Sequence, residues 1–391
     1  MNHMRSLFTL SLLIVSLCFA MTCSSQKDKT EVSEQGTTAG QEIASVVSPT
    51  NADLDKSQNW NELAKLLAGV EGPKSDSPAV NRHRALMKDF WVRIQKENME
   101  PIAAWREKNL PESAKSRNVL YPLSGADFLN AYAFFPGASD YILIALEPPG
   151  SAPHLEKMTE AQRESGLASA RKAIWTLAQN NYLQSRIMHD EFNNPNVTGT
   201  LPAFLIMLGG LGHEVKNVQD IGIGKTGQLA AAADAPRTKG VLIQFKDSKD
   251  GKNKRLIYLS MRLEKQTAES TSPEGIFLRG IGRRNTMMKS AVYILGWESM
   301  KLPHDVILGQ SDLVIQDDSG IPYKSFQDGK WNEKLYGTYV RALPVGGIPN
   351  PPQQGDLAAA YAKGASPLPF AYGYGILRGK GQSNLMLFTR R

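Results

Sequence analysis

Residues 118–150, NVLYPLSGADFLNAYAFFPGASDYILIALEPPG, constrain the fold of this chain more than any other stretch. An apolar start leads into a Ser124–Gly125 turn, then an aromatic helical segment that stops near Pro136, then the β-rich run YILIALE. Two strands about twenty residues apart, with a helix between them, predict a right-handed parallel crossover. We therefore expect parallel pairing early in the sheet.

Helices surround this crossover. The segments 60–70 and 81–110 carry apolar residues at helical spacing, and Pro101 marks a break or kink in the second. A long amphipathic helix follows the crossover, with Thr159 and Gln162 at capping-box spacing. A second apolar helix is expected over 201–212.

The second half of the chain reads mainly as strands. A hairpin is predicted over 240–263, a helix over 283–300, a strand running into a turn over 311–320, a strand over 334–343 and a terminal hairpin over 370–391. The predicted fold class is thus α/β or α+β, with a mixed sheet, an early parallel β-α-β crossover, long amphipathic helices and late antiparallel hairpins.

The N-terminus has the pattern of an export signal. Arg5 precedes an apolar run from Leu7 to Ala20, which is too short for a membrane-spanning helix of about twenty residues. The following residues, AMTC, resemble the lipobox of bacterial lipoproteins, in which a lipid is placed on the cysteine, here Cys23. The resemblance implies lipidation of Cys23. Ala20 and Thr22 depart from the usual lipobox residues, so ordinary cleavage near this point is the alternative.

The resemblance, which covers about the first thirty residues, sets the expected domain organisation. Residues 1–22 would be a signal peptide, 23–58 a lipid-anchored tether, and 59–391 a globular body. The tether prediction follows from its polar composition, which cannot offset the entropy of ordering. The hexamer SSQKDK after Cys23 is similar to export signals of Bacteroidota surface lipoproteins. We expect an extracytoplasmic protein anchored to a membrane, at the periplasmic face or the cell surface.

Charge gives a weaker indication of partners. The formal net charge is +7, and its densest basic part spans 246–284. This stretch could attract an anionic envelope polymer or lipid headgroup. A solvated hairpin loop is the alternative, because Asp247 and Asp250 are interleaved with the lysines. Nucleic acid is not an expected partner, because neither a binding motif nor aromatic interleaving accompanies the charge.

Motifs for phosphate loops and metal sites are incomplete. In GIGKT, the glycine required five positions before Gly224 is Gln219, and in HEVKN the second ligand position of a zinc-protease helix is Asn217. The six histidines show no ligand spacing. We expect neither a metal nor a cofactor.

The crossover supplies the first candidate site. Ser124 and Asp127 follow the first strand, and Glu147 ends the second; nucleotide-binding sheets place an anion and a ribose hydroxyl at such positions. The pattern distantly resembles the first two motifs of class I methyltransferases, but the repeated glycines are missing and Pro122 stands in the turn. The alternative is structural, with Asp127 complementing a helix dipole and Ser124 capping the helix.

A second candidate site lies in QSDLVIQDDSGIPYKSF. Asp317 and Asp318 close an apolar strand, with Tyr323 and Lys324 behind them as hydrogen-bonding or acid/base partners. The alternative is a plain turn, because the sequence Asp-Asp-Ser-Gly strongly favours turns.

A third feature is a set of late aromatic residues, suited either to stacking on sugars or to a strand core. They are Trp331, Tyr336, Tyr339, Tyr361, Phe370, Tyr372 and Tyr374.

No assembled catalytic set emerges from these patterns. The sequence therefore predicts an envelope lipoprotein that binds or scaffolds an envelope component, either a polymer or a protein. The competing class is an extracytoplasmic hydrolase that uses Asp317 or Asp318 with polar groups near Ser124.

Overall fold

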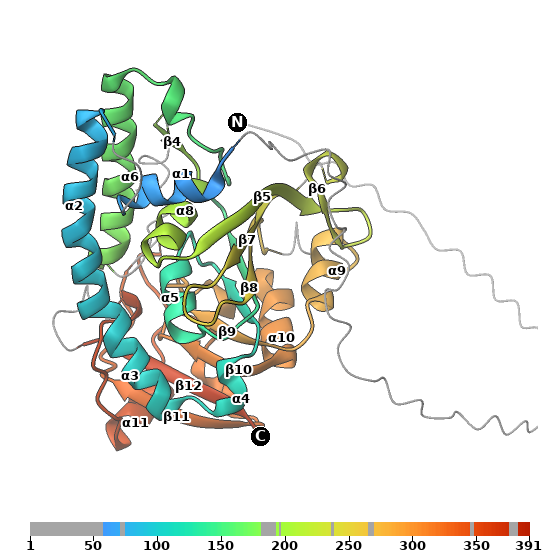
Figure 1. The fold of residues 1–391 in the computed structure, drawn as a ribbon. Coiled ribbons are helices and arrows are strands. Elements are labelled where there is room, and N and C mark those ends of the chain that lie inside the picture. The colour runs from blue at the N-terminus through green and yellow to red at the C-terminus, as the bar shows by residue number, and fades with distance from the viewer. Residues whose placement is uncertain are drawn as a thin grey trace, which may run out of the picture. The chain divides into compact units, whose positions relative to one another are not determined.

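The computed structural model describes residues 58–70, 75–180, 193–194, 197–235, 238–264, 270–344, 348–374 and 382–391 (Figure 1). All of them belong to one compact unit. The predicted signal, Cys23 and nearly all of the predicted tether lie outside the described residues. Within those residues, no helix combines the length and apolarity needed to cross a membrane.

One large mixed sheet organises the body. Its ten strands lie in the order β11-β12-β10-β9-β1-β2-β8-β7-β5-β6. The bounds are β1 Val119–Pro122, β2 Asp140–Ala145, β5 Glu214–Ile223, β6 Leu229–Ala231, β7 Lys239–Lys246, β8 Asn253–Ser260, β9 Arg284–Met288, β10 Ser311–Gln316, β11 Trp331–Gly337 and β12 Asn384–Arg390. The short strands β3 (Asn193–Asn194) and β4 (Val197–Thr198) pair separately.

The five central strands, β10, β9, β1, β2 and β8, run parallel to one another. Antiparallel strands extend the sheet at both sides: β12 and β11 lie beyond β10, and β7, β5 and β6 lie beyond β8. After β1 and β2 the chain forms β5 and β6 at one edge, comes back through β7 to β8 beside β2, and then crosses to the other side of β1 for β9 and β10. This is a doubly wound order whose direction reverses at β1. The mixed sheet and the early crossover β1-α5-β2 are confirmed.

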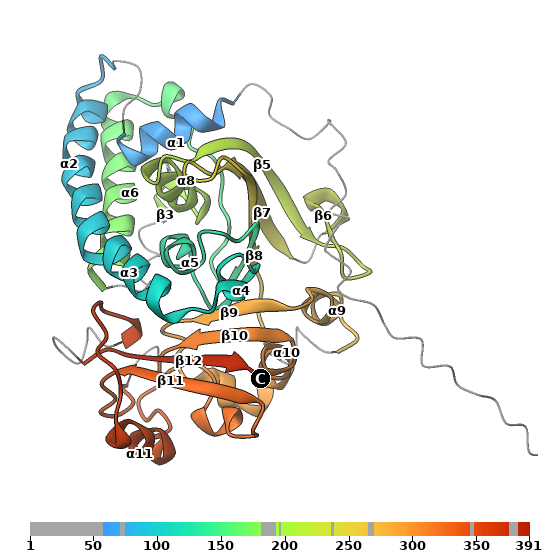
Figure 2. The same ribbon diagram turned by 60° about the horizontal axis from the view of Figure 1, so that its bottom comes forward.

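Helices cover both faces of the sheet (Figures 1 and 2). The bounds are α1 Trp60–Ala68, α2 Pro78–Ile94, α3 Glu100–Asn109, α4 Glu112–Lys115, α5 Phe128–Phe134, α6 Glu160–Asn180, α8 Leu201–Gly210, α9 Pro273–Gly280, α10 Lys301–Gln310 and α11 Gly355–Lys363. Successive strand side chains point to opposite faces, so Tyr121 packs in one core with α1, α2, α5 and α8, while Leu120 packs in the other with α9 and α10.

Two local sequence signals appear in the helices as expected. The Thr159 hydroxyl accepts a hydrogen bond from the Gln162 amide at 3.3 Å, and the Gln162 side chain accepts one from the Thr159 amide at 2.9 Å. This is a complete capping box. Before Pro101, the helix widens into a π-helical segment, Gln95–Met99, which absorbs the missing proline N–H without a break.

Two element predictions are wrong. Residues 283–300, predicted as a helix, contain strand β9 and two short 3₁₀ turns, Ile294–Gly296 and Glu298–Met300. β9 is buried between β1 and β10, and a strand covered on both faces shows no period-two alternation. The predicted terminal hairpin is also absent from the described residues, because β12 pairs with β10 and β11 instead.

Candidate functional sites at the two ends of the parallel strands

Doubly wound sheets hold ligands outside the carboxyl ends of their strands. Five of the predicted site residues lie at this end: Ser124 and Asp127 after β1, Glu147 after β2, and Asp317 and Asp318 after β10. All five side chains are buried. We call this region the carboxyl edge.

Asp127 is held by the protein itself. It caps α5 by accepting a hydrogen bond from the Asn130 amide at 3.2 Å, and it accepts the Tyr121 hydroxyl at 3.0 Å. Its carboxylate also pairs with Lys289 at 2.5 Å, with both side chains only 1% exposed. Burial lowers the pKa of Lys289, and the neighbouring Asp127 opposes that shift. The Asp127–Lys289 pair therefore ties the turn after β1 to the end of β9.

Asp317 has a full set of internal donors. It accepts the Ser319 hydroxyl at 2.5 Å, the Tyr374 amide at 3.1 Å and the Ser290 amide at 3.3 Å. Gly373, with φ +57°, packs so closely on this carboxylate that a Cβ atom would collide with it. Burial, followed by the charge of Asp318, raises the pKa of Asp317 to about 6.

Asp318 is bound on its own side. Its carboxylate accepts the Asn384 amide group at 2.7 Å and the Tyr293 hydroxyl at 3.1 Å, while its backbone amide donates to Asn384 Oδ1 at 2.8 Å. The chain turns at once, with the Gly320 amide donating to the Asp317 carbonyl at 3.2 Å. The turn interpretation of this sequence is therefore confirmed.

The turn after β1 is also occupied. The Ser124 hydroxyl donates to the Gly125 carbonyl at 2.9 Å, so the predicted helix cap is Asp127 and not Ser124. The backbone amides of Ser124, Asp127 and Phe128 all donate within the protein. A nucleotide phosphate needs such amides free, so this turn does not fit the group that the methyltransferase resemblance implies.

Glu147 differs from the other acids at this edge. It is 7% exposed, and neither carboxylate oxygen has a hydrogen-bond partner among the described residues. Its backbone carbonyl accepts the Tyr258 hydroxyl at 2.7 Å.

Ser124, Glu147 and Asp317 all lie at the carboxyl edge of the sheet. Since neighbouring strands lie about 4.8 Å apart, however, β10 and β2 are separated by roughly 14 Å there.

Tyr323 and Lys324 do not join the acids. They lie in a 3₁₀ turn, η6 (Tyr323–Phe326), where the Tyr323 hydroxyl donates to Glu333 at 3.0 Å and Lys324 is exposed. Burial and the Glu333 contact raise the pKa of Tyr323 to about 12.

The late aromatic residues belong mainly to the core, which agrees with the strand-core interpretation. Trp331, Tyr336, Tyr339, Phe370, Tyr372 and Tyr374 are buried, and Tyr361 is half-buried.

Backbone strain is concentrated at the carboxyl edge. Leu123 after β1 and Ser290, Val292 and Tyr293 after β9 all have φ between 52° and 60°. Side chains with a Cβ rarely adopt this left-handed region, and each such residue costs on the order of 1 kcal/mol or more. Strain of this kind is typical of functional sites, although here it also positions the Ser290 amide on Asp317.

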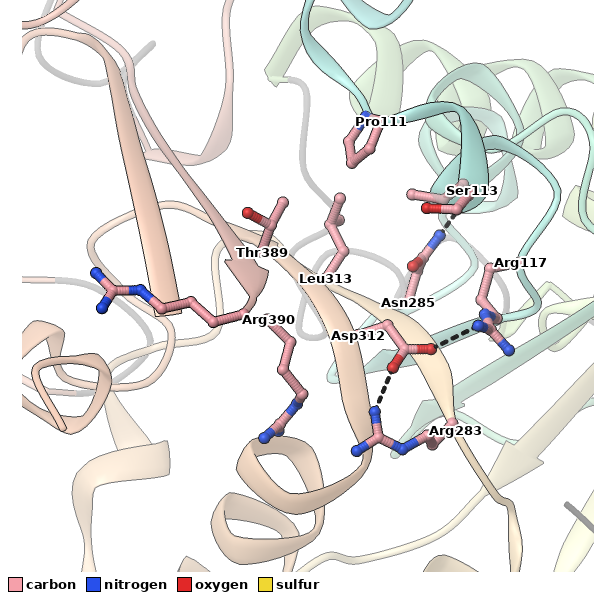
Figure 3. A pocket seen from close by; sticks show the side chains of 11 residues that line it. Pro111, Ser113, Arg117, Arg283, Asn285, Asp312, Leu313, Thr389 and Arg390 are labelled. Atoms are coloured by element: carbon pink, nitrogen blue, oxygen red, sulfur yellow. Dashed lines mark hydrogen bonds and ion pairs between the residues drawn. The ribbon is translucent and has the colours of Figure 1, made fainter. Parts of the chain in front are cut away.

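The opposite ends of the parallel strands carry an open cavity, which we call the arginine pocket. Its volume is about 430 Å³. It lies at the amino ends of β9 and β10, beside α4 and the end of β12 (Figure 3). Its lining consists of Pro111, Ser113, Ala114, Arg117, Arg283, Asn285, Asp312, Leu313, Thr389, Arg390 and Arg391.

Four arginines and one carboxylate, Asp312, belong to this lining. Arg117 and Arg283 both turn toward Asp312, at 3.0 and 2.5 Å (Figure 3). Arg390 lies over the Trp331 ring at 4.5 Å and donates to the carbonyls of Ser311 and Leu308. Burial, followed by the charge of Arg283, lowers the pKa of Arg390. Positive charge is therefore in excess here.

The pocket also contains a buried acceptor. Asn285 is fully buried, and its Nδ2 group donates to the Ala114 carbonyl at 2.6 Å. This bond fixes the amide orientation, and Oδ1 is left with no partner among the described residues. A buried acceptor without a donor costs about 1–3 kcal/mol, so Asn285 is a position where a ligand donor would be stabilising.

The sequence predicted none of this pocket as a site. Its arginines come from three distant segments, and only Arg283 falls within the basic stretch 246–284. At the start of that stretch, β7 and β8 form the predicted hairpin with an exposed loop, and Lys254 forms a buried pair with Asp247 at 2.7 Å beside it. The available signals were the arginine pairs at 283–284 and 390–391, which nothing in the sequence places together.

Among the described residues, no group of three or more metal-ligating side chains is close enough to hold an ion. No protein-family model, curated protein or solved structure matches this chain.

Proposed function

We propose that this chain is a lipid-anchored, extracytoplasmic protein that binds an anionic component of the cell envelope. The arginine pocket carries the proposal, because it combines an open cavity with four arginines and one carboxylate. Its volume of about 430 Å³ is in the range of small-molecule sites. Arginine forks suit carboxylate and phosphate groups.

The state of the carboxyl edge supports binding over catalysis. The acids that would serve a hydrolase, Asp317 and Asp318, are buried and accept hydrogen bonds from the protein. Ser124 donates to a backbone carbonyl, and its hydroxyl has no hydrogen bond to a basic side chain among the described residues. A nucleophile requires an adjacent base and access to the substrate.

Binding is tested by equilibrium sedimentation of the purified protein with anionic envelope polymers, run with an assay for released fragments. The proposal predicts retention that falls as salt rises, with no fragments released. If the protein sediments with none of the anionic polymers at low salt, the proposal is contradicted.

The anchor is a separate part of the proposal. It rests on the lipobox-like residues before Cys23, and places the body at a membrane by a thioether-linked lipid. Mass spectrometry of the mature protein from cells would show a lipid mass on Cys23. An unmodified N-terminus beyond residue 23, with release of the protein by washing, would overturn the anchor and leave the pocket unaffected.

A hydrolase is the second candidate function, and one observation favours it. The left-handed residues Ser290, Val292 and Tyr293 lie in the loop after β9, and the Ser290 amide donates to Asp317, whose pKa is raised to about 6. Strain and a shifted pKa together are typical of catalytic sites. Asp318→Asn and Ser124→Ala variants test it: loss of fragment release with a folded protein would establish the hydrolase, and no turnover in any form removes it.

A further inference from the structure

The polar groups of the arginine pocket are of two kinds. Arg117, Arg283 and Arg390 supply N–H donors, and Asn285 Oδ1 supplies a buried acceptor without a partner among the described residues. A simple anion satisfies only the first kind. We propose that the ligand is a phosphorylated polyol, a phosphate group with a hydroxyl on a nearby carbon; this rests on the anion-binding function proposed above.

Arginine placement favours phosphate over carboxylate. Arg117 lies before β1, Arg283 before β9 and Arg390 at the end of β12, so guanidinium groups reach the cavity from three segments. A planar carboxylate offers two oxygens and one charge. A phosphate monoester offers three oxygens and a charge of about −1.5 to −2, which matches several cations from different directions.

Asp312 positions two of the arginines. It forms an ion pair with Arg117 through one oxygen and accepts a hydrogen bond from Arg283 on the other, which holds both side chains beside the cavity. Each guanidinium uses one nitrogen on Asp312 and keeps others for a ligand. Asp312 is thus a positioning residue, and a bound phosphate would lie between Arg283 and Arg390, whose charges otherwise repel.

The ligand hydroxyl is assigned to Asn285. Because Nδ2 already donates to Ala114, the free oxygen can only accept, and a hydroxyl is a donor that a phosphorylated polyol carries. Leu313 and Pro111 supply apolar wall for the carbon skeleton. Two sources share this chemistry: an envelope polymer that ends in a sugar or glycerol phosphate monoester, and a lipid whose polyol headgroup carries a phosphate monoester.

The experiment is isothermal titration of the full-length protein with glycerol 3-phosphate, ethyl phosphate and inorganic phosphate. The lipid arm compares flotation with vesicles of phosphatidylcholine containing 20% phosphatidylinositol 4-phosphate, whose headgroup carries a phosphate monoester, against vesicles of phosphatidylcholine alone, to which a lipid on Cys23 would bind equally. The test variant is Arg283→Gln, at a side chain that is 54% exposed. The control is Arg82→Gln on α2, which removes the same charge from a side chain 62% exposed that pairs with Glu164.

We expect Arg283→Gln to weaken glycerol 3-phosphate binding at least tenfold, and Arg82→Gln to change it less than twofold. Ethyl phosphate, which lacks the hydroxyls, should bind about fivefold more weakly than glycerol 3-phosphate, the value of one hydrogen bond. Arg117→Gln should repeat the loss, and circular dichroism checks that each variant is folded. More flotation with the phosphatidylinositol 4-phosphate vesicles than with phosphatidylcholine alone assigns the lipid source, and equal flotation with both assigns the soluble or polymeric one.

Equal losses in Arg283→Gln and Arg82→Gln would overturn the inference, as would equal binding of ethyl phosphate and glycerol 3-phosphate. If an anionic polymer without phosphate is retained and inorganic phosphate does not compete, the phosphate assignment falls while the binding function stands. If the protein retains no anion at all, the binding function itself falls.

Discussion

The two ends of the parallel strands differ in how their charges are satisfied. At the carboxyl edge, Asp127, Asp317 and Asp318 are buried and each receives donors from the protein. In the arginine pocket at the amino ends, four arginines and one carboxylate line an open cavity, and two of the arginines pair with that carboxylate. Charged groups that are neutralised internally stabilise a fold, whereas charged groups left in excess at a cavity are available to a ligand. The carboxyl edge, where doubly wound sheets usually bind ligands, is therefore occupied by contacts within the protein. The excess charge lies at the amino ends of the strands, in the arginine pocket.

The largest expected effect is on the carboxyl edge. Lys289→Met leaves Asp127 buried without its charged partner, which should lower the free energy of unfolding by about 3–5 kcal/mol. Urea denaturation followed by circular dichroism measures it. Adding Asp127→Asn, which keeps an acceptor for the α5 cap, should recover part of the loss.

The matched control for Lys289 is Lys301→Met. Lys301 pairs with Asp305 at 2.6 Å, but its side chain is 62% exposed, so this variant should unfold like the wild type. A loss in Lys289→Met no greater than in Lys301→Met would mean that the buried pair is not structural, and the contrast between the two edges would fail.

A pH profile gives the next largest effect. The pKa of Asp317 is raised from its usual value near 3.8 to about 6, so the folded protein binds more protons than the unfolded chain between pH 4 and 6. Its contribution to stability therefore falls as pH rises through this window, by on the order of 2 kcal/mol.

Asp317→Asn removes this titration. As the pH goes from 4 to 6, the free energy of unfolding of the variant should therefore fall less, or rise more, than that of the wild type. His83 and His213, whose pKa values burial lowers to about 4, contribute the opposite slope to both proteins and cancel in the difference. Identical pH profiles for the two proteins would show that Asp317 titrates normally.

Glu147 tests the exception at the carboxyl edge. The buried Glu147 carboxylate has no hydrogen-bond partner among the described residues, so Glu147→Leu should raise the free energy of unfolding by about 1 kcal/mol by removing an unsatisfied polar group. Urea denaturation measures the change. A clear loss of stability would instead indicate that Glu147 has a partner that the fold depends on.

The smallest effect is expected in the arginine pocket. Arg283 pairs with Asp312, but its side chain is 54% exposed and solvent screens the pair, so Arg283→Gln should cost less than about 1 kcal/mol. The same denaturation measures it. A cost as large as that of Lys289→Met would make the pocket arginines structural and remove the difference between the edges.

The parts of the fold that sequence predicted have local causes. The β1-α5-β2 crossover, the capping box at Thr159 and the β7–β8 hairpin are each encoded within about thirty residues. β9 was missed because Asn285 and Thr286 lie inside a strand covered on both faces, where no alternation distinguishes it from a helix.

The candidate sites were predicted only as far as local patterns reach. Acids at strand ends are a local pattern and indicated the carboxyl edge, but the donors to these acids come from distant segments: Lys289 directly after β9, Asn384 from β12 and Tyr374 from the segment before β12. The arginine pocket depends on strand order as a whole, because β12 must lie beside β10 to bring Arg390 near Arg283.

The most direct test of the account is a crystal structure of the protein soaked with tungstate, a heavy phosphate analogue whose anomalous signal locates it without ambiguity. The account predicts a tungstate between Arg283 and Arg390, with Asp312 still bound to Arg117. A tungstate in the turn after β1, near Ser124 and Asp127, with none among the arginines, would contradict it.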